Sequence, residues 1–445
     1  MKKEMYRKIL MVALCIVMVF AMAACGGGGS STGDSSGGSN ASTETTGGGE
    51  PSAPATTDKT EILVGFAAPL TGPLAIFMGP TPWVEALCLD AINNQNGGIL
   101  VDGKQLPIRV IYADTESDSN KAMEAATKLV TQDKVDILVG AWTPVGANPI
   151  SAVAERYEIP AFTFGAPEES WLEGGPYKWA TGMHFNYDLL CTDIINMWNK
   201  LDTNKKVGFV LDTDVDGATG REVYTRMLEG TEYEIFDPGA YTIGTTDFTS
   251  MISKLKEANV EIITADMITP DFTTFWKQCH QYGYIPKVCT INKGMHYEAD
   301  VENLGDDGGN GITFSSLWDK NFPFSSPLLG MSATEIADLW QSENEGFYPY
   351  SIGYDVAMYD ILNDVLTRAG TLDKATLLDA ILATDIDTVF GNLSFNENQC
   401  MVVPAIATQW LPGETFPFEK KVVSSETFPA IPSYDPIIIP ATTQK

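Results

Sequence analysis

The sequence predicts an α/β protein with two lobes, and three observations support this prediction. Short apolar runs alternate with segments of helical periodicity from Glu61 to Ile291. The second half of this region repeats the order of elements of the first half. At 445 residues, the chain is also too long for one hydrophobic core. Such alternation is typical of parallel sheets covered by helices on both faces.

The clearest unit runs from Asp136 to Pro167 and reads as strand, loop, helix, strand and loop. Its helix is expected over Pro149 to Glu158, where apolar residues recur at helical spacing. In open α/β sheets, ligands bind at the loops that follow the carboxyl ends of the strands. The loops Gly140 to Gly146 and Gly165 to Pro167 are therefore expected to line a ligand site.

The other elements follow from the same periodicities, taken in chain order. Strands are expected at Glu61–Ala67, Pro107–Tyr112, Asp136–Gly140, Pro160–Phe164, Lys206–Leu211, Tyr233–Phe236, Glu261–Ala265, Val288–Ile291 and Ala405–Leu411. Helices are expected around Val84–Ile92 and at Ser119–Thr131, Gly220–Leu228, Phe248–Ala258, Phe272–Tyr282, Thr334–Ser342, Ile352–Ala369 and Lys374–Ala383.

The first 24 residues have the layout of a signal peptide, with four basic residues before an uncharged run. Met22-Ala23-Ala24-Cys25 resembles the lipobox of bacterial lipoproteins, which implies lipidation of Cys25. The alternative is an ordinary signal peptide with an incidental cysteine. Residues 25–60 are rich in Gly, Ser and Thr, as in a flexible tether. The sequence thus predicts a protein anchored at the outer face of the cytoplasmic membrane.

Charge and cysteine content limit the partners and the chemistry. The formal net charge of −30 becomes −33 without the leader, which holds four basic residues and one acidic residue. Such a surface repels nucleic acid. Five cysteines remain beside Cys25, and their spacings fit no zinc template, so buried thiols are expected, with one disulfide left open. They are Cys88, Cys191, Cys279, Cys289 and Cys400.

No catalytic or cofactor motif stands out. Asp212, Asp214 and Asp216 with Gly217 resemble the start of a calcium loop, but Val223 stands where a bidentate Glu is needed. A loop between strand and helix is the simpler interpretation. The three histidines are far apart in sequence, and hydrolase and nucleotide signatures are absent. We therefore expect no metal, no cofactor and no enzymatic activity.

One long region resembles a known family. VGFAAPLTGPLAIFMG, the segment from Asp90 to Gly140, and SAVAERYEIPAFTFGA resemble the leucine/isoleucine/valine-binding periplasmic proteins, the type I substrate-binding lipoproteins of ABC importers. The resemblance implies two Rossmann-like lobes, a three-stranded hinge and a central ligand cleft. It also implies chain crossings near Gly182, Ser316 and Thr388. The N-terminal lobe would comprise residues 61–182 and 317–388, and the C-terminal lobe residues 183–316 and 389–445.

The residues themselves suggest part of the ligand site. Where a strand ends and a helix begins, free N–H groups favour an anion, so Thr143 to Gly146 is a candidate carboxylate seat. Trp142 lies in the expected loop Gly140 to Gly146 and could supply an apolar wall, as could Trp171. Phe77 follows the turn Thr71-Gly72-Pro73, where the resemblance to the family implies an aromatic residue that covers the ligand.

The resemblance adds further positions to this site. Further ligand contacts are expected at Thr163, near the end of one strand, at Gly165 and Ala166 in the loop after it, and at Asp216 and Asn292 in the second lobe. Asp216 stands where the family commonly carries an aromatic residue, so the resemblance implies no aromatic contact from that loop. Pro144 and Pro167 replace hydroxyl residues of the family pattern. The family's acid for a ligand ammonium falls at Ile291–Lys293, which offers no carboxylate, so either Asp266 or Asp271 replaces it, or the ligand is not a plain α-amino acid.

Together these features predict a monomeric solute-binding protein of an ABC importer. By lobe closure it would bind a branched-chain amino acid or a similar small carboxylate and present it to permease and ATPase subunits. A tethered ligand sensor with the same fold is the alternative, and a secreted enzyme is a remote one.

Overall fold

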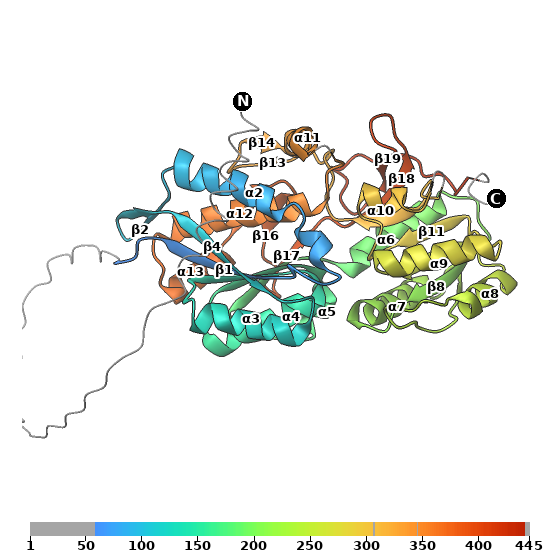
Figure 1. Ribbon diagram of the computed structural model, residues 1–445, viewed down its shortest axis with the longest axis horizontal. Helices are drawn as coiled ribbons and strands as arrows, with labels where there is room; N and C mark the ends of the chain where they lie inside the picture. The colour runs from blue at the N-terminus through green and yellow to red at the C-terminus, as the bar shows by residue number, and fades with distance from the viewer. Residues whose placement is uncertain (1–57, 306–307, 345, 441–445) are drawn as a thin grey trace, which may run out of the picture. The chain divides into compact units, whose positions relative to one another are not determined.

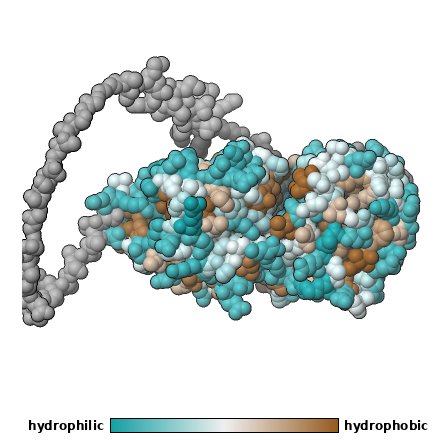
Figure 2. Space-filling model, turned by 90° about the horizontal axis from the view of Figure 1, so that it is seen from below, coloured by the Kyte–Doolittle hydropathy of each residue, from teal (hydrophilic) through white to brown (hydrophobic). Residues whose placement is uncertain are grey.

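The computed structural model describes residues 58–305, 308–344 and 346–440. The signal peptide, Cys25 and nearly all of the tether lie outside these residues. In the described part, no helix is both long and apolar enough to cross a bilayer. Polar residues dominate the face shown in Figure 2, as the high negative charge requires, and they are interrupted by small hydrophobic patches.

The first lobe is built on a six-stranded sheet in the order β17-β7-β6-β5-β1-β4, in which all neighbours are parallel (Figure 1). Helices α3 and α4 cover one face of the sheet, while α2 and α12 cover the other. The strands are β1 (Ile62–Ala68), β4 (Ile108–Asp114), β5 (Ile137–Ala141), β6 (Ala161–Pro167), β7 (Ala180–Phe185) and β17 (Cys400–Val403). The helices are α2 (Thr81–Leu89), α3 (Ser119–Thr131), α4 (Thr143–Tyr157), α5 (Glu168–Leu172), α11 (Ala333–Asn344), α12 (Ser351–Ala369) and α13 (Lys374–Leu382).

The second lobe is built on a seven-stranded sheet in the order β19-β18-β12-β11-β10-β8-β9. Five strands run parallel, and β18 and β19 close one edge as an antiparallel pair. The strands are β8 (Lys206–Leu211), β9 (Glu234–Phe236), β10 (Ile262–Asp266), β11 (Val288–Ile291), β12 (Thr313–Ser316), β18 (Ile406–Pro412) and β19 (Phe418–Ser424). The helices are α6 (Tyr187–Asn199), α7 (Val215–Leu228), α8 (Thr249–Glu257), α9 (Thr269–Gln281) and α10 (Glu298–Glu302).

The chain passes between the two sheets three times. The first crossing follows β7, and the second follows Ser316, close to the expected positions. The third crossing lies after Val403, so the expected boundary near Thr388 is wrong. The apolar strand β17 pairs with β7 from Cys400↔Gly182 to Val403↔Phe185 and so occupies the open edge of the first sheet. Residues 391–403 thus belong with the first lobe.

Two helices begin earlier than the sequence suggested. Helix α4 begins at Thr143 and not at Pro149, because Pro144 occupies its first turn, where a missing N–H costs nothing. Most of the loop expected at Gly140 to Gly146 is therefore helix. Helix α7 begins at Val215 and not at Gly220, because the Asp214 side chain caps it by accepting from Gly217 N at 3.2 Å.

Short antiparallel elements escaped the sequence prediction. They are the hairpins β2–β3 (Ile99–Val101, Lys104–Leu106), β13–β14 (Ser325–Ser326, Met331–Ser332) and β15–β16 (Asp385–Thr388, Gly391–Ser394), and the strand β19. The short 3-10 helix η1 (Ala75–Met78) and the π-helix η2 (Asp90–Gln95) were not predicted as such either. The sequence analysis also missed the parallel strands β7, β12 and β17 and the helices α5, α6 and α10. The other helices and parallel strands were predicted correctly in kind, and α3 also in its bounds. The five cysteines that follow Cys25 in the chain are all buried and free, which confirms the expectation of buried thiols.

Candidate functional site

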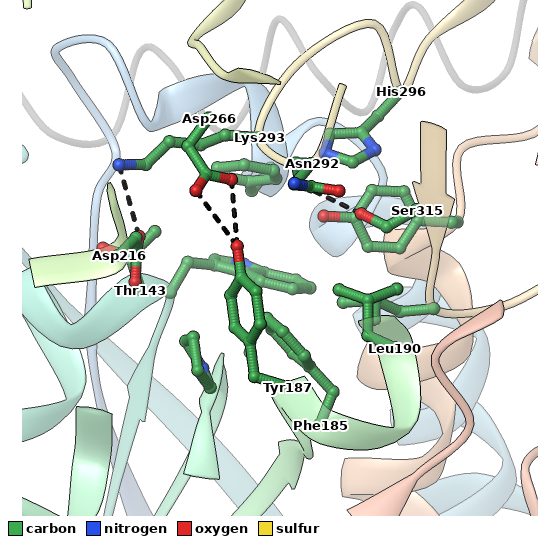
Figure 3. Close-up of a pocket in the computed structure, with 16 residues that line it drawn as sticks. Thr143, Phe185, Tyr187, Leu190, Asp216, Asp266, Asn292, Lys293, His296 and Ser315 are labelled. Carbon is green, nitrogen blue, oxygen red and sulfur yellow. Dashed lines mark hydrogen bonds and ion pairs between the residues drawn. The ribbon is translucent and has the colours of Figure 1, made fainter. Parts of the chain in front are cut away.

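A cavity lies between the carboxyl ends of the strands of both lobes, as expected for open α/β sheets (Figure 3). The first lobe contributes Phe77 of η1, the residues that follow β5, the ends of β6 and β7, and Tyr350 just before α12. The second lobe contributes the start of α6 and α7 and the residues that follow β10, β11 and β12. The volume is about 50 Å³, which has room for only a few water molecules.

The first-lobe wall presents hydrogen-bond donors. Thr143 stands at the start of α4, and its φ of +57° turns the chain sharply out of β5. Among the described residues, its Oγ1 and the Nε1 of Trp142 have no hydrogen-bond partner, although both atoms are buried. Burying such groups without a partner is costly. Together with the positive end of the α4 dipole, they form a place for an anion.

Aromatic rings form the apolar part of this wall. Phe77 stacks on Trp142 with ring centroids 5.2 Å apart, and Tyr354 meets Trp142 edge-on at 4.9 Å. Gly165 allows this packing, because a Cβ at that position would lie 2.2 Å from Trp142 Cε3. Its φ of +80° is also one that L side chains rarely adopt. The position of the Trp142 ring therefore requires glycine at residue 165.

Acidic groups dominate the second-lobe wall. Asp266, at the end of β10, is 1% exposed and accepts from Tyr187 Oη at 3.0 Å and 3.1 Å (Figure 3). Burial raises the pKa of its carboxyl to about 7, against an opposing attraction by Lys293. Burial also raises the pKa of Asp216, in the first turn of α7. Near neutral pH, the Asp266 carboxyl can therefore exchange a proton for a ligand cation.

The carboxylates that resemble a calcium loop surround a lysine. Lys293 Nζ lies 3.0 Å from Asp212 Oδ2 and 3.3 Å from Asp216 Oδ2, and it also contacts Asp214. These charges raise the pKa of Lys293 above its ordinary value. No group of residues suited to a metal ion occurs in the described ranges. The second half of Asp212–Gly217 is the start of α7, not a calcium loop.

Three further atoms on this wall are buried without a partner in the described chain: Asp216 Oδ1, Asn292 Oδ1 and His296 Nδ1. The oxygens are acceptors, and burial lowers the pKa of His296 to about 3, so that its imidazole is neutral. The cavity thus has donors on the first lobe and mainly acceptors on the second. A ligand with an acceptor group at one end and a donor group at the other matches this polarity.

The structure brings most of the predicted site residues to the cavity and leaves others away from it. Those that line the cavity are Phe77, Trp142, Thr143, Gly165, Asp216, Asp266 and Asn292. Those that do not are Gly146, Thr163, Ala166, Asp271 and Trp171.

Each residue outside the cavity wall has another environment. Thr163 Oγ1 donates to Thr181 O at 3.3 Å, and Ala166 N donates to His184 Nδ1 at 3.2 Å. Both groups are thus bonded to the neighbouring strand β7. Asp271 accepts from Gly244 N at 3.2 Å and 3.0 Å. Trp171 Nε1 donates to Ser151 Oγ at 2.9 Å inside the first lobe. Gly146 is buried within the first turn of α4.

Sequence reasoning missed several cavity residues. Tyr187 and Leu190 lie at the start of α6, and Tyr350 immediately precedes α12. These residues carry no motif, and their chain positions are far from the expected loops. Lys293 was not predicted to line the cavity. The signal for it was its position beside Asn292, just after a strand, where a charged side chain can reach a ligand site.

Comparison with known proteins places the chain in a family. The model of the periplasmic binding protein family matches residues 61–414. The chain therefore belongs to this family, and it is a solute-binding protein by class. The earlier resemblance and the type I fold with two α/β lobes are thereby confirmed.

Individual relatives agree with this placement. Leu/Ile/Val-binding protein homolog 7 of Brucella abortus is 21% identical over 384 residues, which cover 82% of this chain and 92% of the relative. An amino acid binding protein of Pseudomonas aeruginosa is 25% identical over 346 residues, covering 76% and 86%.

Solved structures share the fold. The branched-chain amino acid binding protein LivJ of Streptococcus pneumoniae, in complex with isoleucine, superposes with a TM-score of 0.68 at 22% identity, covering 82% of this chain and 99% of LivJ. A solute-binding protein of Rhodopseudomonas palustris, in complex with 3,4-dihydroxybenzoic acid, gives 0.65 at 15% identity, covering 86% and 100%.

Proposed function

We propose that this protein is a membrane-anchored, monomeric solute-binding protein of an ABC importer that captures an amino acid with an apolar side chain. The observation that carries the proposal is the opposed polarity of the cavity walls. Thr143 and Trp142, whose buried donors have no partner within the described residues, line the first-lobe side of the cavity, and the acceptors Asp216 and Asp266 line the second-lobe side. A zwitterion with a carboxylate toward the first lobe and an ammonium toward the second fits this arrangement.

The aromatic wall supports an apolar ligand body. Phe77, Trp142 and Tyr350 lie on one side, and Leu190 and Leu317 lie on the other. Such a surface stabilises an aliphatic or aromatic side chain by burial. An aromatic carboxylate with a hydroxyl donor is the second ligand class that this wall favours. The relatives include proteins solved with isoleucine and with 3,4-dihydroxybenzoic acid, which supports either class.

The size of the cavity supports capture by lobe closure. A space of about 50 Å³ is too small for an amino acid to enter without movement of its walls. Because both lobes line the cavity, separation of the lobes opens it, and contacts to both lobes favour the closed form when ligand is present. A membrane-tethered sensor would use the same closure, with a receptor in place of a permease.

The ligand class has a specific pH signature. Below pH 7, Asp266 must release a proton before it pairs with a ligand ammonium, so amino-acid affinity is expected to rise by up to about tenfold per pH unit from pH 5.5 to 7. Above pH 7 the affinity should level off. Isothermal titration calorimetry with leucine, isoleucine, valine and phenylalanine measures this dependence.

The deaminated acids of the same ligands are the control, because they lack the ammonium. Their affinities are not expected to rise over this pH range. Equal pH profiles for leucine and its deaminated acid would contradict the ammonium site. Failure of every carboxylate to bind would contradict the donor wall, and turnover of a bound ligand would favour an enzyme instead.

The anchor gives a separate prediction. Cys25 lies outside the described residues, and its lipidation is proposed from the lipobox-like run before it. Cys25→Ser should release the protein into the medium or leave it unprocessed, because a lipid on this residue would be the attachment to the membrane. Detergent phase partition of parent and variant measures this. Equal partition of the two proteins into detergent would show that Cys25 is not the anchor.

A further inference from the structure

Lys293 occupies a position that a ligand cation could take. It follows β11 at the cavity edge, and its side chain is 9% exposed. An ammonium has three N–H donors, and the carboxylates of Asp212, Asp214 and Asp216 supply one acceptor each. The ammonium of Lys293 therefore pairs with three carboxylates, two on the connection between β8 and α7 and one in the first turn of α7.

Two of the three carboxylates make contacts that do not involve Lys293. Asp214 caps α7 by accepting from Gly217 N at 3.2 Å, and Asp212 Oδ1 accepts from Asp214 N at 3.2 Å. Asp216 belongs to the first turn of α7. Because backbone groups hold the Asp212 and Asp214 carboxylates and helix α7 holds the backbone of Asp216, the acceptors of Asp212 and Asp214 should keep their positions when the lysine side chain is shortened.

This group of carboxylates opens on the ligand cavity. Lys293 and, of the three acids, Asp216 line it, and Figure 3 shows the lysine side chain extending to Asp216. Asp216 Oδ1 is buried and has no partner within the described residues. A cation held here would thus be adjacent to the ligand.

We propose that Lys293 is a specificity-determining residue that fills a cation seat formed by Asp212, Asp214 and Asp216 with its own ammonium, and so excludes ligands that carry a second ammonium. The inference builds on the proposed amino-acid function, since it concerns which amino acids the same cavity accepts. Basic amino acids and diamines are the excluded class. Amino acids with a single ammonium retain access to Asp266.

The exclusion has two physical causes. A second ligand ammonium would meet a like charge at the seat, in a buried place where Coulomb repulsion is poorly screened. A free ligand also competes poorly with a tethered group, whose effective concentration at the seat is high. Removing the tethered ammonium should therefore convert the excluded class into ligands.

The test compares Lys293→Ala with Lys293→Met, which removes the charge but keeps most of the volume. Lysine and norleucine form a matched ligand pair, since their chains are similar and only lysine has the second ammonium. In Lys293→Ala the ratio of lysine to norleucine affinity, measured by calorimetry, is expected to rise by about tenfold or more over the parent. In Lys293→Met it should not rise to this extent, because Met fills the seat.

A second measurement does not depend on amino-acid binding. n-Butylamine resembles the deleted side chain and should raise the melting temperature of Lys293→Ala more than that of the parent or of Lys293→Met. An unchanged affinity ratio, or equal effects of butylamine on all three proteins, would overturn the proposal. Butylamine stabilisation without binding of any amino acid would instead support the seat and contradict the proposed ligand class.

Discussion

Asp266→Asn is expected to lower the affinity for an amino acid by about a hundredfold or more. The carboxylate lies at the end of β10, lines the cavity and is the most deeply buried acid on the second-lobe wall. Removing one partner of a buried charge pair leaves the other uncompensated, which typically costs 2–5 kcal/mol or roughly 30- to several-thousand-fold in affinity. Asn keeps the shape and can still accept from Tyr187 Oη. Calorimetry with leucine or phenylalanine gives the change directly.

Asp271→Asn is the matched control, because Asp271 is a nearby acid that does not line the cavity. Its carboxylate instead binds the backbone of Gly244. The affinity of this variant should stay within about twofold of the parent, since no ligand contact is lost. Tight amino-acid binding that survives both substitutions would show that neither acid takes the ammonium. The deaminated acid should bind parent and Asp266→Asn alike.

Gly165→Ala is expected to abolish ligand binding and to lower the free energy of unfolding by roughly 2–5 kcal/mol. Two costs combine at this position. The new Cβ would lie 2.2 Å from the Trp142 ring, and the φ of +80° is unfavourable for alanine. Trp142 is 1% exposed and packs against four other aromatic rings, so it has little freedom to retreat. Urea unfolding and calorimetry measure the two effects.

Gly103→Ala separates backbone strain from the clash. Gly103 has the same φ of +80°, but a Cβ there would meet no atom within 4 Å. It lies in the turn between β2 and β3, away from the cavity. This variant should lose only the strain cost of roughly 1–2 kcal/mol and should bind ligand normally. Similar losses in the two variants would show that contact with Trp142 is not what requires glycine at position 165.

The pattern of elements and part of the site could be predicted from the sequence. Periodicity is a local property, so α3 was placed with its observed bounds and most parallel strands were found close to theirs, although β7, β12 and β17 were missed. The donor wall was also predictable, because it requires only that Thr143 lie where a strand ends and a helix begins. The short antiparallel hairpins have too few residues to show a period, and they were missed.

The tertiary structure alone decided the rest, because it depends on contacts between distant residues. Asp266 and Asp271 were equal candidates in sequence, and only the packing of β10 and α9 places Asp266 on the cavity wall and Asp271 against Gly244. The Lys293 ammonium meets Asp212, 81 residues away, and no local pattern encodes that pairing. Strand β17 likewise joined the first sheet because β7 offered an open edge, which the chain order does not reveal.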